Sequence, residues 1–392
     1  MNKLLGYSAL AVVLGAGASA PAVADTASTK GGVVIKSDDG QFEASLGGRL
    51  HYDYNYIDED EVEDTSTDGF FMRRAYITLA GKLYGFEYKL ETDIKGNDPS
   101  AKDMWIGHKT LGGFVKAGHM QPAYGMEELT SSNDILFIER PFLSNNTVFS
   151  GREYQNGVSY DTAGEQYSAF FAYYNANASA DSDASRAAEG DGMSGRVTFA
   201  PINTKTSLVH VGASYDWVDF DDAIANPSPS ASARYADRNG PRLTIVSGGY
   251  GQQSTATVEA AAMYGPFSVQ GEYGMATYET KDADDQDVDA WYVQASWFVT
   301  GESRTYKVER GVFGSVKPNA PTGAWELKAR YDTVKNKDAA NDPEATTISA
   351  GVNYYMNPAV RFMLDYNFGH AEQNGAPDDE PSAIALRAQL KF

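Results

Sequence analysis

The chain ends in the stretch IALRAQLKF, residues 384–392. Its even-numbered residues are apolar, whereas the residues between them are small, basic or amide side chains. Successive side chains of a β-strand point to opposite faces, so this segment has one apolar face and one polar face. A strand with these two faces is typical of a transmembrane β-barrel, whose wall separates lipid from a water-filled lumen.

The same alternation recurs along the chain. Segments with an apolar face are found at 42–56, 75–81, 86–94, 103–109, 114–118, 154–161, 167–175, 196–200, 207–217, 255–264, 267–278, 288–300, 325–333, 347–356, 360–369 and 383–392. An even number of strands brings both termini of a barrel to one side of the membrane, so residues 243–246, a further apolar run, are assigned to a loop. The pattern predicts an all-β fold, a 16-stranded antiparallel transmembrane β-barrel.

The N-terminus carries the marks of an export signal. Lys3 precedes an apolar stretch at 4–18, and the residues Ala22-Val23-Ala24 form a small-residue cleavage motif, which predicts a signal peptide over 1–24. Residues 25–40 are expected to be a flexible N-terminal segment and 41–392 a single barrel domain, because no linker composition divides them. The chain has no cysteine, so disulfides do not contribute to its stability.

Composition and motifs narrow the class of function. A net charge of −21 argues against nucleic acid as a partner. The histidines show no metal-ligand spacing on one strand face, and no nucleophile motif is present, so neither a metal site, nor a cofactor, nor an enzyme activity is predicted. The two-faced strands predict a place in the bacterial outer membrane, with the lipid bilayer and surface lipopolysaccharide as partners.

The connections between the segments also alternate in length. Tight turns at 83–85, 111–113, 265–266 and 357–358 are placed in the periplasm, and acidic stretches at 58–64, 181–191, 282–289, 335–344 and 372–380 are placed outside the cell. Residues 119–150 differ, because this long connection is apolar and less acidic than the others. A loop of that composition is expected to fold into the barrel and to narrow it as a constriction loop.

Several motifs in one order resemble the phosphate-selective porin O and P family. They are DGQF (39–42) with LGGR (46–49), FMRRA (71–75), GHMQPAYGME (118–127) with LTSS (129–132), ERP (139–141), GPFS (265–268) with EY (272–273), and TGESRTY (300–306) with GVF (311–313) and VKP (316–318). The resemblance covers nearly the whole chain after the leader. It implies a homotrimer of sixteen-stranded barrels and a basic lumen that favours small inorganic anions such as phosphate or polyphosphate.

One position departs from the family pattern. Members often carry a Lys before an acidic residue, Pro and Phe in the constriction loop, whereas Gln121 stands at this place here. An amide offers hydrogen bonds without charge. Together with the negative net charge, this leaves a general or cation-tolerant diffusion porin as an alternative, and a non-conducting surface or adhesin barrel as another.

The strand phase identifies the basic residues that face the lumen. Those on strands are Arg49, Lys89, Arg196, Lys328, Arg330, Arg361, Arg387 and Lys391. Arginine and lysine bind anions through charge-assisted hydrogen bonds. Acidic residues such as Asp53, Glu259 and Asp365 share the inward phase, so pairing across strands is an equally open interpretation.

A constriction concentrates the electric field, so basic residues near it are the first candidates for anion binding. They are Arg74, Arg140, Arg152, Arg304 and Lys317. The competing interpretation is an ion pair of each with a nearby acid, which would fix the loop to the wall. Arg73 and Arg74 are adjacent, so only one of them faces the lumen unless a β-bulge intervenes.

Overall fold

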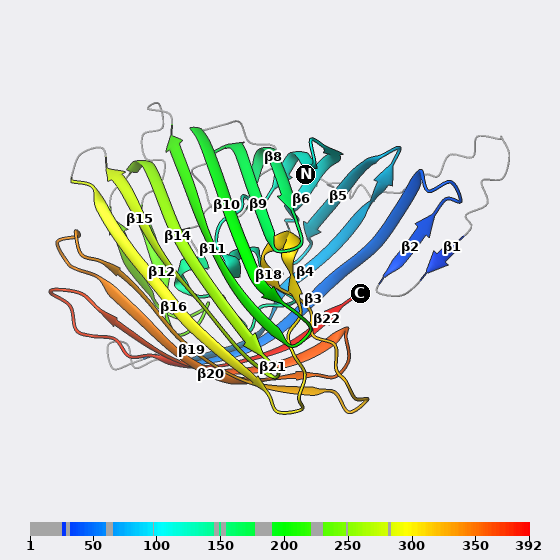
Figure 1. Cartoon of the computed structure of the whole chain (residues 1–392). Helices are drawn as coiled ribbons and strands as arrows, with labels where there is room; N and C mark the ends of the chain where they lie inside the picture. Colours follow the sequence, from blue (N-terminus) through cyan, green and yellow to red (C-terminus); the bar gives the residue numbers. More distant parts are fainter. Residues whose placement is uncertain are drawn as a thin grey trace, which may run out of the picture.

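The computed structural model describes residues 26–28, 32–59, 66–96, 98–144, 149, 154–176, 190–220, 230–247, 250–280 and 284–392. Within these residues, sixteen antiparallel strands form a closed barrel (Figure 1). The first wall strand pairs with the last, with Leu50 opposite Leu390, and this pairing closes the wall. The expected signal peptide at 1–24 and the candidate Arg152 lie outside the described residues.

The wall follows the chain order, and each strand pairs with its neighbours in sequence. Its strands are β3 (Phe42–Asp58), β4 (Ser66–Leu83), β5 (Phe86–Asp93), β6 (Ser100–Thr110), β7 (Gly113–Met120), β8 (Gln155–Ala163), β9 (Tyr167–Asn175), β10 (Gly190–Asn203), β11 (Ser207–Phe220), β14 (Tyr250–Tyr264), β15 (Phe267–Thr280), β16 (Gln286–Phe298), β19 (Ala324–Asn336), β20 (Glu344–Tyr355), β21 (Val360–Glu372) and β22 (Ser382–Lys391). The sixteen strands predicted from the alternation are confirmed. Residues 243–246 lie outside the wall, in a hairpin.

The two faces of the wall follow the sequence pattern. On β22, Leu386 is 43% exposed, whereas Arg387 is 2% exposed, because the first points away from the barrel and the second into it. Aromatic rings stack in pairs on the outer face near the tight turns. The ring centroids of Phe267 and Trp297 are 5.8 Å apart, and those of Trp325 and Tyr354 are 4.5 Å apart. Aromatic pairs of this kind form the girdles that barrels place at the two membrane interfaces.

One end of the barrel, the turn end, carries the tight turns and the C-terminus. In the turn between β4 and β5, Tyr84 and Gly85 have φ of 49° and 85°, and Leu111 and Gly112 between β6 and β7 have φ of 53° and 75°. Two successive residues at positive φ are typical of type I′ turns, whose twist matches that of the two strands. The opposite end, the loop end, carries the long connections.

The connection between β16 and β19 breaks this rule, since it lies at the turn end but runs from 299 to 323. It contains β17 (Tyr306–Lys307), η2 (Val308–Arg310) and β18 (Val312–Phe313), and it folds up into the barrel (Figure 1). The alternation of connection lengths did not predict this turn-end segment. It turns inward because Val312 and Phe313 are apolar and bury 99% of their surface.

Two loop-end segments also fold inside. The constriction loop between β7 and β8 contains α1 (Met126–Leu129) and η1 (Phe142–Ser144), as its apolar content predicted. The inner hairpin of β12 (Ser230–Arg234) and β13 (Arg242–Ser247) packs its buried side chains against the same core as η1. The lumen is therefore narrowed by segments that enter from both ends.

The N-terminal segment contains short strands within the residues that were expected to be flexible. Thr26–Ser28 (β1) pairs with Val33–Lys36 (β2), and β2 pairs with β3, where Val33 lies opposite Leu46. These strands extend the sheet beside the barrel (Figure 1). No helix in the described ranges is long and apolar enough to cross a membrane.

A β-bulge between β3 and β4 turns two adjacent arginines inward. His51 lies opposite Arg74 and Tyr52 lies opposite Met72, so Arg73 is the extra residue of the bulge. Both arginines are buried. From the sequence, both arginines could face the lumen only if a β-bulge intervened. The structure contains this bulge, whose inserted residue shifts the alternation by one position.

Candidate functional site: a basic passage through the barrel

The constriction loop lies along the inner wall with its backbone bonded to wall side chains. A loop inside a barrel has no strand partner, so its carbonyl groups need other donors. Wall residues supply these donors: Arg361 to Ile135 O (2.9 Å), Lys328 to Leu136 O (3.0 Å), Arg387 to Ile138 O (2.8 Å) and Arg330 to Glu139 O (2.9 Å). We call these four residues the loop clamp.

Wall carboxylates serve the N–H groups of the same loop. Asp365 accepts from Ile138 N at 2.7 Å, and Asp332 accepts from Phe142 N at 2.9 Å. Inward acids and inward bases are therefore both used to hold the loop, which explains why they share one strand phase.

Two residues of the loop clamp are also paired with acids. Arg387 donates to Asp53 at 2.8 and 2.7 Å, and Lys328 Nζ lies 2.5 Å from Asp365. Arg196, on the other side of the wall, pairs with Glu259 at 2.5 Å and donates to the carbonyl of Gly311 at 2.8 Å. These basic residues hold inner segments in place, as the pairing interpretation has it.

A different group of basic residues surrounds a cavity of about 100 Å³ beside the constriction loop, the constriction cavity. Its basic lining consists of Arg49, Arg74, Lys89, Arg140, Lys307 and Arg310. Its acidic lining consists of Glu91, Asp103 and Glu128. Positive groups outnumber negative ones here, although the whole chain is acidic.

The constriction cavity continues toward the turn end. A larger cavity of about 640 Å³, the turn-end cavity, shares Arg49, Lys89 and Glu91 with it and adds Lys317 and Lys391. Phe392 lines this cavity as well, so it reaches the C-terminal end of the barrel.

The constriction cavity also continues toward the loop end. A smaller cavity of about 30 Å³, the loop-end cavity, shares Arg140 with it. Its other charged lining residues are the basic Arg234, Arg238 and Arg330 and the acidic Glu139, Asp237, Asp332 and Asp365. The three cavities share lining residues in series. We call this series the basic passage, because basic residues outnumber acidic ones in the constriction cavity and in the turn-end cavity.

Arg74 is a buried charge of this passage without a direct partner among the described residues. Its side chain is buried, it makes no ion pair among the described residues, and no described group accepts a hydrogen bond from its Nη1 atom. Its neighbour Arg73 is bound by Glu139 at 2.5 and 2.9 Å. The bulge thus places one paired and one unpaired guanidinium side by side.

Other cavity residues are partly paired. Arg49 donates to Ser132 Oγ at 2.9 Å and lies 3.2 Å from Glu91, and Lys89 lies 2.6 Å from Asp103. Gln121, where the family often has a lysine, lines the constriction cavity and donates to Glu128 Oε1 at 2.5 Å.

The remaining candidates divide between residues that hold inner segments in place and residues that line the passage. Arg140 donates to the carbonyls of Thr130 (2.7 Å) and Glu127 (3.1 Å) at the end of α1, yet it lines two cavities. Arg304 donates to Asp134 O at 3.1 Å, lies 4.2 Å from the ring of Phe313 and lines none of the three cavities. Lys317 is exposed in the turn-end cavity.

Sequence reasoning identified Arg140, Arg310 and Lys317 among the cavity residues that come from loops, but it missed others. Those missed are Arg234 and Arg238 of the inner hairpin and Lys307 of the turn-end connection. Strand alternation carries no information on loop residues. A usable signal was the run of apolar and basic residues at 304–317, which is unusual for an exposed turn.

Two loop carboxyls have displaced pKa values. Burial alone would raise the pKa of Glu139, but Arg73 and Arg74 hold this pKa well below its usual range. Burial raises the pKa of Asp237, near the tip of the inner hairpin, to about 7, and the nearby carboxylates Glu139 and Asp53 act in the same direction. Asp237 lines the loop-end cavity and bonds to Asn55 of the wall.

Known proteins share this architecture. The family model described as phosphate-selective porin O and P matches residues 45–392. Porin O of Pseudomonas aeruginosa is 31% identical over 438 aligned positions, which cover 99% of each chain.

Among solved structures, the anion-selective porin from Comamonas acidovorans has a TM-score of 0.59 at 14% identity, covering 90% of this chain and 100% of that one. OmpT of Vibrio cholerae, an outer membrane protein, has a TM-score of 0.60 at 14% identity, covering 92% and 99%. The barrel with its outward apolar face is located in the bacterial outer membrane. On the family match and the identity to Porin O, the chain belongs to the phosphate-selective porin O and P family.

Proposed function

We propose that this porin is a passive diffusion channel that prefers anions such as phosphate or polyphosphate, and that anions move along the basic passage. The proposal rests mainly on Arg74, a buried guanidinium at the constriction cavity. No described group accepts a hydrogen bond from its Nη1 atom. A buried charge without a partner is costly, and a passing anion supplies the missing partner.

The series of cavities supports movement rather than storage. Each cavity shares basic residues with the next, so an anion leaves one set of donors as it meets the following set. Several weak sites in sequence allow both entry and exit, which conduction requires. Most of the cavity bases other than Arg74 are paired with acids or loop atoms, which keeps each site weak.

The relatives support the same preference. The name of the family includes phosphate selectivity, and the Comamonas acidovorans structure is described as an anion-selective porin. One OmpT structure is described as a trimer form, and we propose a homotrimer for this chain as well. The leader at 1–24 is proposed to direct export, with residues 41–392 forming the channel domain.

Reversal potentials across a planar bilayer with a salt gradient test the proposal. We expect a potential on the anion side, and we expect phosphate to reduce the chloride current by competing for the same donors. A reversal potential of the sign expected for cation selectivity would refute the anion preference and favour the cation-tolerant porin. Gln121 and the net charge of −21 are the observations that support this alternative. A protein without conductance would favour the non-conducting surface barrel.

The variant Arg74→Gln tests the role of the unpaired guanidinium. A charge at about 5 Å in an effective dielectric of about 20 contributes about 3 kcal/mol before screening by salt, so the anion-to-cation permeability ratio should fall several-fold. Lys205→Gln is the matched control, because it also removes one positive charge but lies in an exposed turn between β10 and β11. Equal effects of both variants would show that only the net charge matters.

A further inference from the structure

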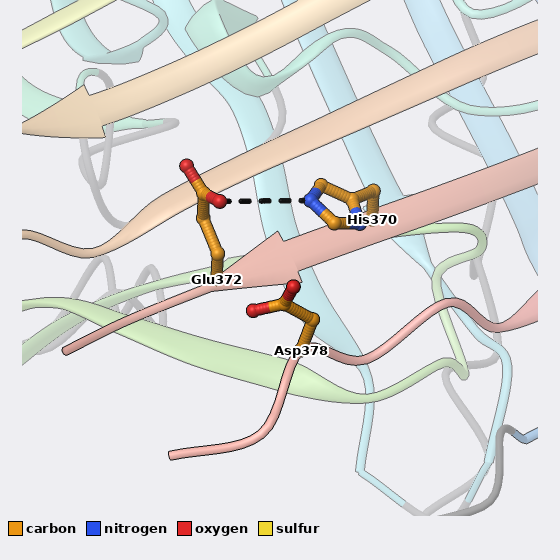
Figure 2. Close-up of side chains that lie close together, drawn as sticks. All are labelled: His370, Glu372 and Asp378. Atoms are coloured by element: carbon orange, nitrogen blue, oxygen red, sulfur yellow. Dashed lines mark ion pairs between the residues drawn. The ribbon is translucent and has the colours of Figure 1, made fainter. Parts of the chain in front are cut away.

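Three side chains with metal-binding atoms meet at the loop end of β21. His370 and Glu372 lie two residues apart on this strand, and Asp378 belongs to the connection that follows it. One ligand atom from each side chain lies within 4.8 Å of the others. Figure 2 shows the three side chains around one gap, with His370 Nε2 and Glu372 Oε2 at 3.8 Å.

The backbone holds these side chains in register. Ala371 N donates to Asp379 O at 2.8 Å, and Asp379 N donates to Ala371 O at 2.9 Å. Gly369 N donates to Pro381 O at 2.8 Å and continues the pairing. Each of the three side chains is adjacent in sequence to a residue of this paired backbone, so a ligand that brings them together has to order side chains but no backbone.

The other ring nitrogen of the histidine provides an independent indication. His370 Nδ1 lies 3.5 Å from Glu380 Oε1. A carboxylate at one imidazole nitrogen is the usual second partner of a metal-bound histidine, since it fixes the tautomer and leaves the lone pair of the other nitrogen for the metal. Here that other nitrogen, Nε2, faces Glu372.

We propose that His370, Glu372 and Asp378 form a binding site for a borderline divalent cation such as Zn²⁺. One imidazole nitrogen and two carboxylates match the donors that zinc prefers, whereas Ca²⁺ and Mg²⁺ are bound by oxygen ligands alone. Three protein ligands leave the fourth position of a tetrahedral ion open. The charge of the ion balances the two carboxylates.

The strand phase places this site outside the barrel. Tyr366 and Phe368 on β21 are exposed on the lipid side, and His370 and Glu372 follow in the same phase beyond them. The cation site therefore lies on the outer face, at the loop end of β21. It is separate from the basic passage and does not depend on the proposed anion preference.

Isothermal titration of the detergent-solubilised full chain with zinc chloride tests the site. We expect a single saturable site per chain, with weak or no binding of calcium chloride. His370→Ala and Asp378→Asn should each weaken zinc binding by at least about tenfold, and Glu380→Gln, which changes only the positioning residue, should weaken it by about tenfold. X-ray absorption at the zinc edge should show one nitrogen ligand that His370→Ala removes.

The matched control is His108→Ala. His108 is exposed near the turn end, where its ring centroid lies 4.9 Å from that of Phe86, and this substitution should leave zinc binding unchanged. Failure of the wild type to bind zinc would show that the three residues pair only with one another and would overturn the proposal. Binding that survives His370→Ala, or calcium binding of equal strength, would overturn it as well.

Discussion

Two neighbouring parts of the barrel wall use the same types of basic side chain differently. On β19, β21 and β22, the loop clamp donates to backbone carbonyls of the constriction loop. On β3, β4 and β5, Arg49, Arg74 and Lys89 face a cavity. Both sets lie on wall strands and both point inward, so neither residue type nor strand phase separates them.

The difference follows from where the constriction loop lies. Along β19, β21 and β22, backbone carbonyls of the constriction loop need donors. The basic residues of these strands are held by the carbonyls and by buried acids such as Asp53 and Asp365. Along β3, β4 and β5 the loop leaves a cavity, and the basic residues there line it. Of the four loop-clamp residues, Arg330 alone also lines a cavity of the passage, the loop-end cavity.

The largest effect is expected from breaking the loop clamp. Arg387→Gln removes two hydrogen bonds to Asp53 and one to Ile138 O, and it leaves Asp53 as a buried, uncompensated charge. The free energy of unfolding should fall by about 3–5 kcal/mol. Urea titration followed by tryptophan fluorescence measures this change, and single-channel recordings should become noisier as the loop detaches.

The double variant Asp53→Asn with Arg387→Gln serves as the control for this prediction. Removal of both charges should restore a large part of the lost stability, because no buried charge is left without a partner. By contrast, Arg74→Gln breaks no ion pair among the described residues and removes a buried charge, so the unfolding free energy should not fall. Equal destabilisation by Arg387→Gln and Arg74→Gln would contradict the division into two roles.

An intermediate effect is expected from pH at the inner hairpin. The pKa of Asp237 is raised from 3.8 to about 7, so between these values the folded protein keeps a proton that the unfolded chain has released. The stability of the folded hairpin should therefore rise as the pH falls from 7 toward 4. The folding equilibrium constant should increase by up to about tenfold per pH unit.

Protonation of Asp237 also removes a negative charge from the loop-end cavity, which is lined by Arg234 and Arg238. The anion-to-cation permeability ratio should therefore be higher at about pH 5.5 than at about pH 8. Reversal potentials at both values measure it. Asp237→Asn should abolish this dependence, and a dependence that persists in the variant would assign the effect to other groups.

The smallest effect is expected at the wide part of the passage. Lys317 is exposed in the turn-end cavity of about 640 Å³, where water and salt screen its charge. Lys317→Gln should change the permeability ratio by less than about twofold, as measured by reversal potential. A change as large as that of Arg74→Gln would show that selectivity is set at the turn end rather than at the constriction.

Much of the wall could be predicted from the sequence. The alternation at 384–392 placed Arg387 inward and Leu386 outward, and the structure shows both. The apolar composition of 119–150 predicted that this connection folds inside. The turn-end segment 299–323 was not predicted to do so. Its inward fold depends on contacts with residues inside the barrel and not on the local pattern of apolar and polar residues.

The candidate site was less accessible to sequence reasoning. Arg74 was selected as a candidate from its phase and its position near the constriction, yet the bulge that also turns Arg73 inward had no sequence signal. The cluster of His370, Glu372 and Asp378 escaped a search for ligand spacing on one strand, because its third member arrives from the following connection.

The amino-acid sequence by itself determined the architecture: the number of wall strands, the face that each residue occupies and the apolar outer surface. These properties depend on neighbours one or two positions away, since strand geometry repeats every two residues. Only the tertiary structure decided which basic residues are held and which remain available. That outcome depends on pairs such as Asp53 and Arg387, 334 positions apart in the chain, which meet because the barrel closes.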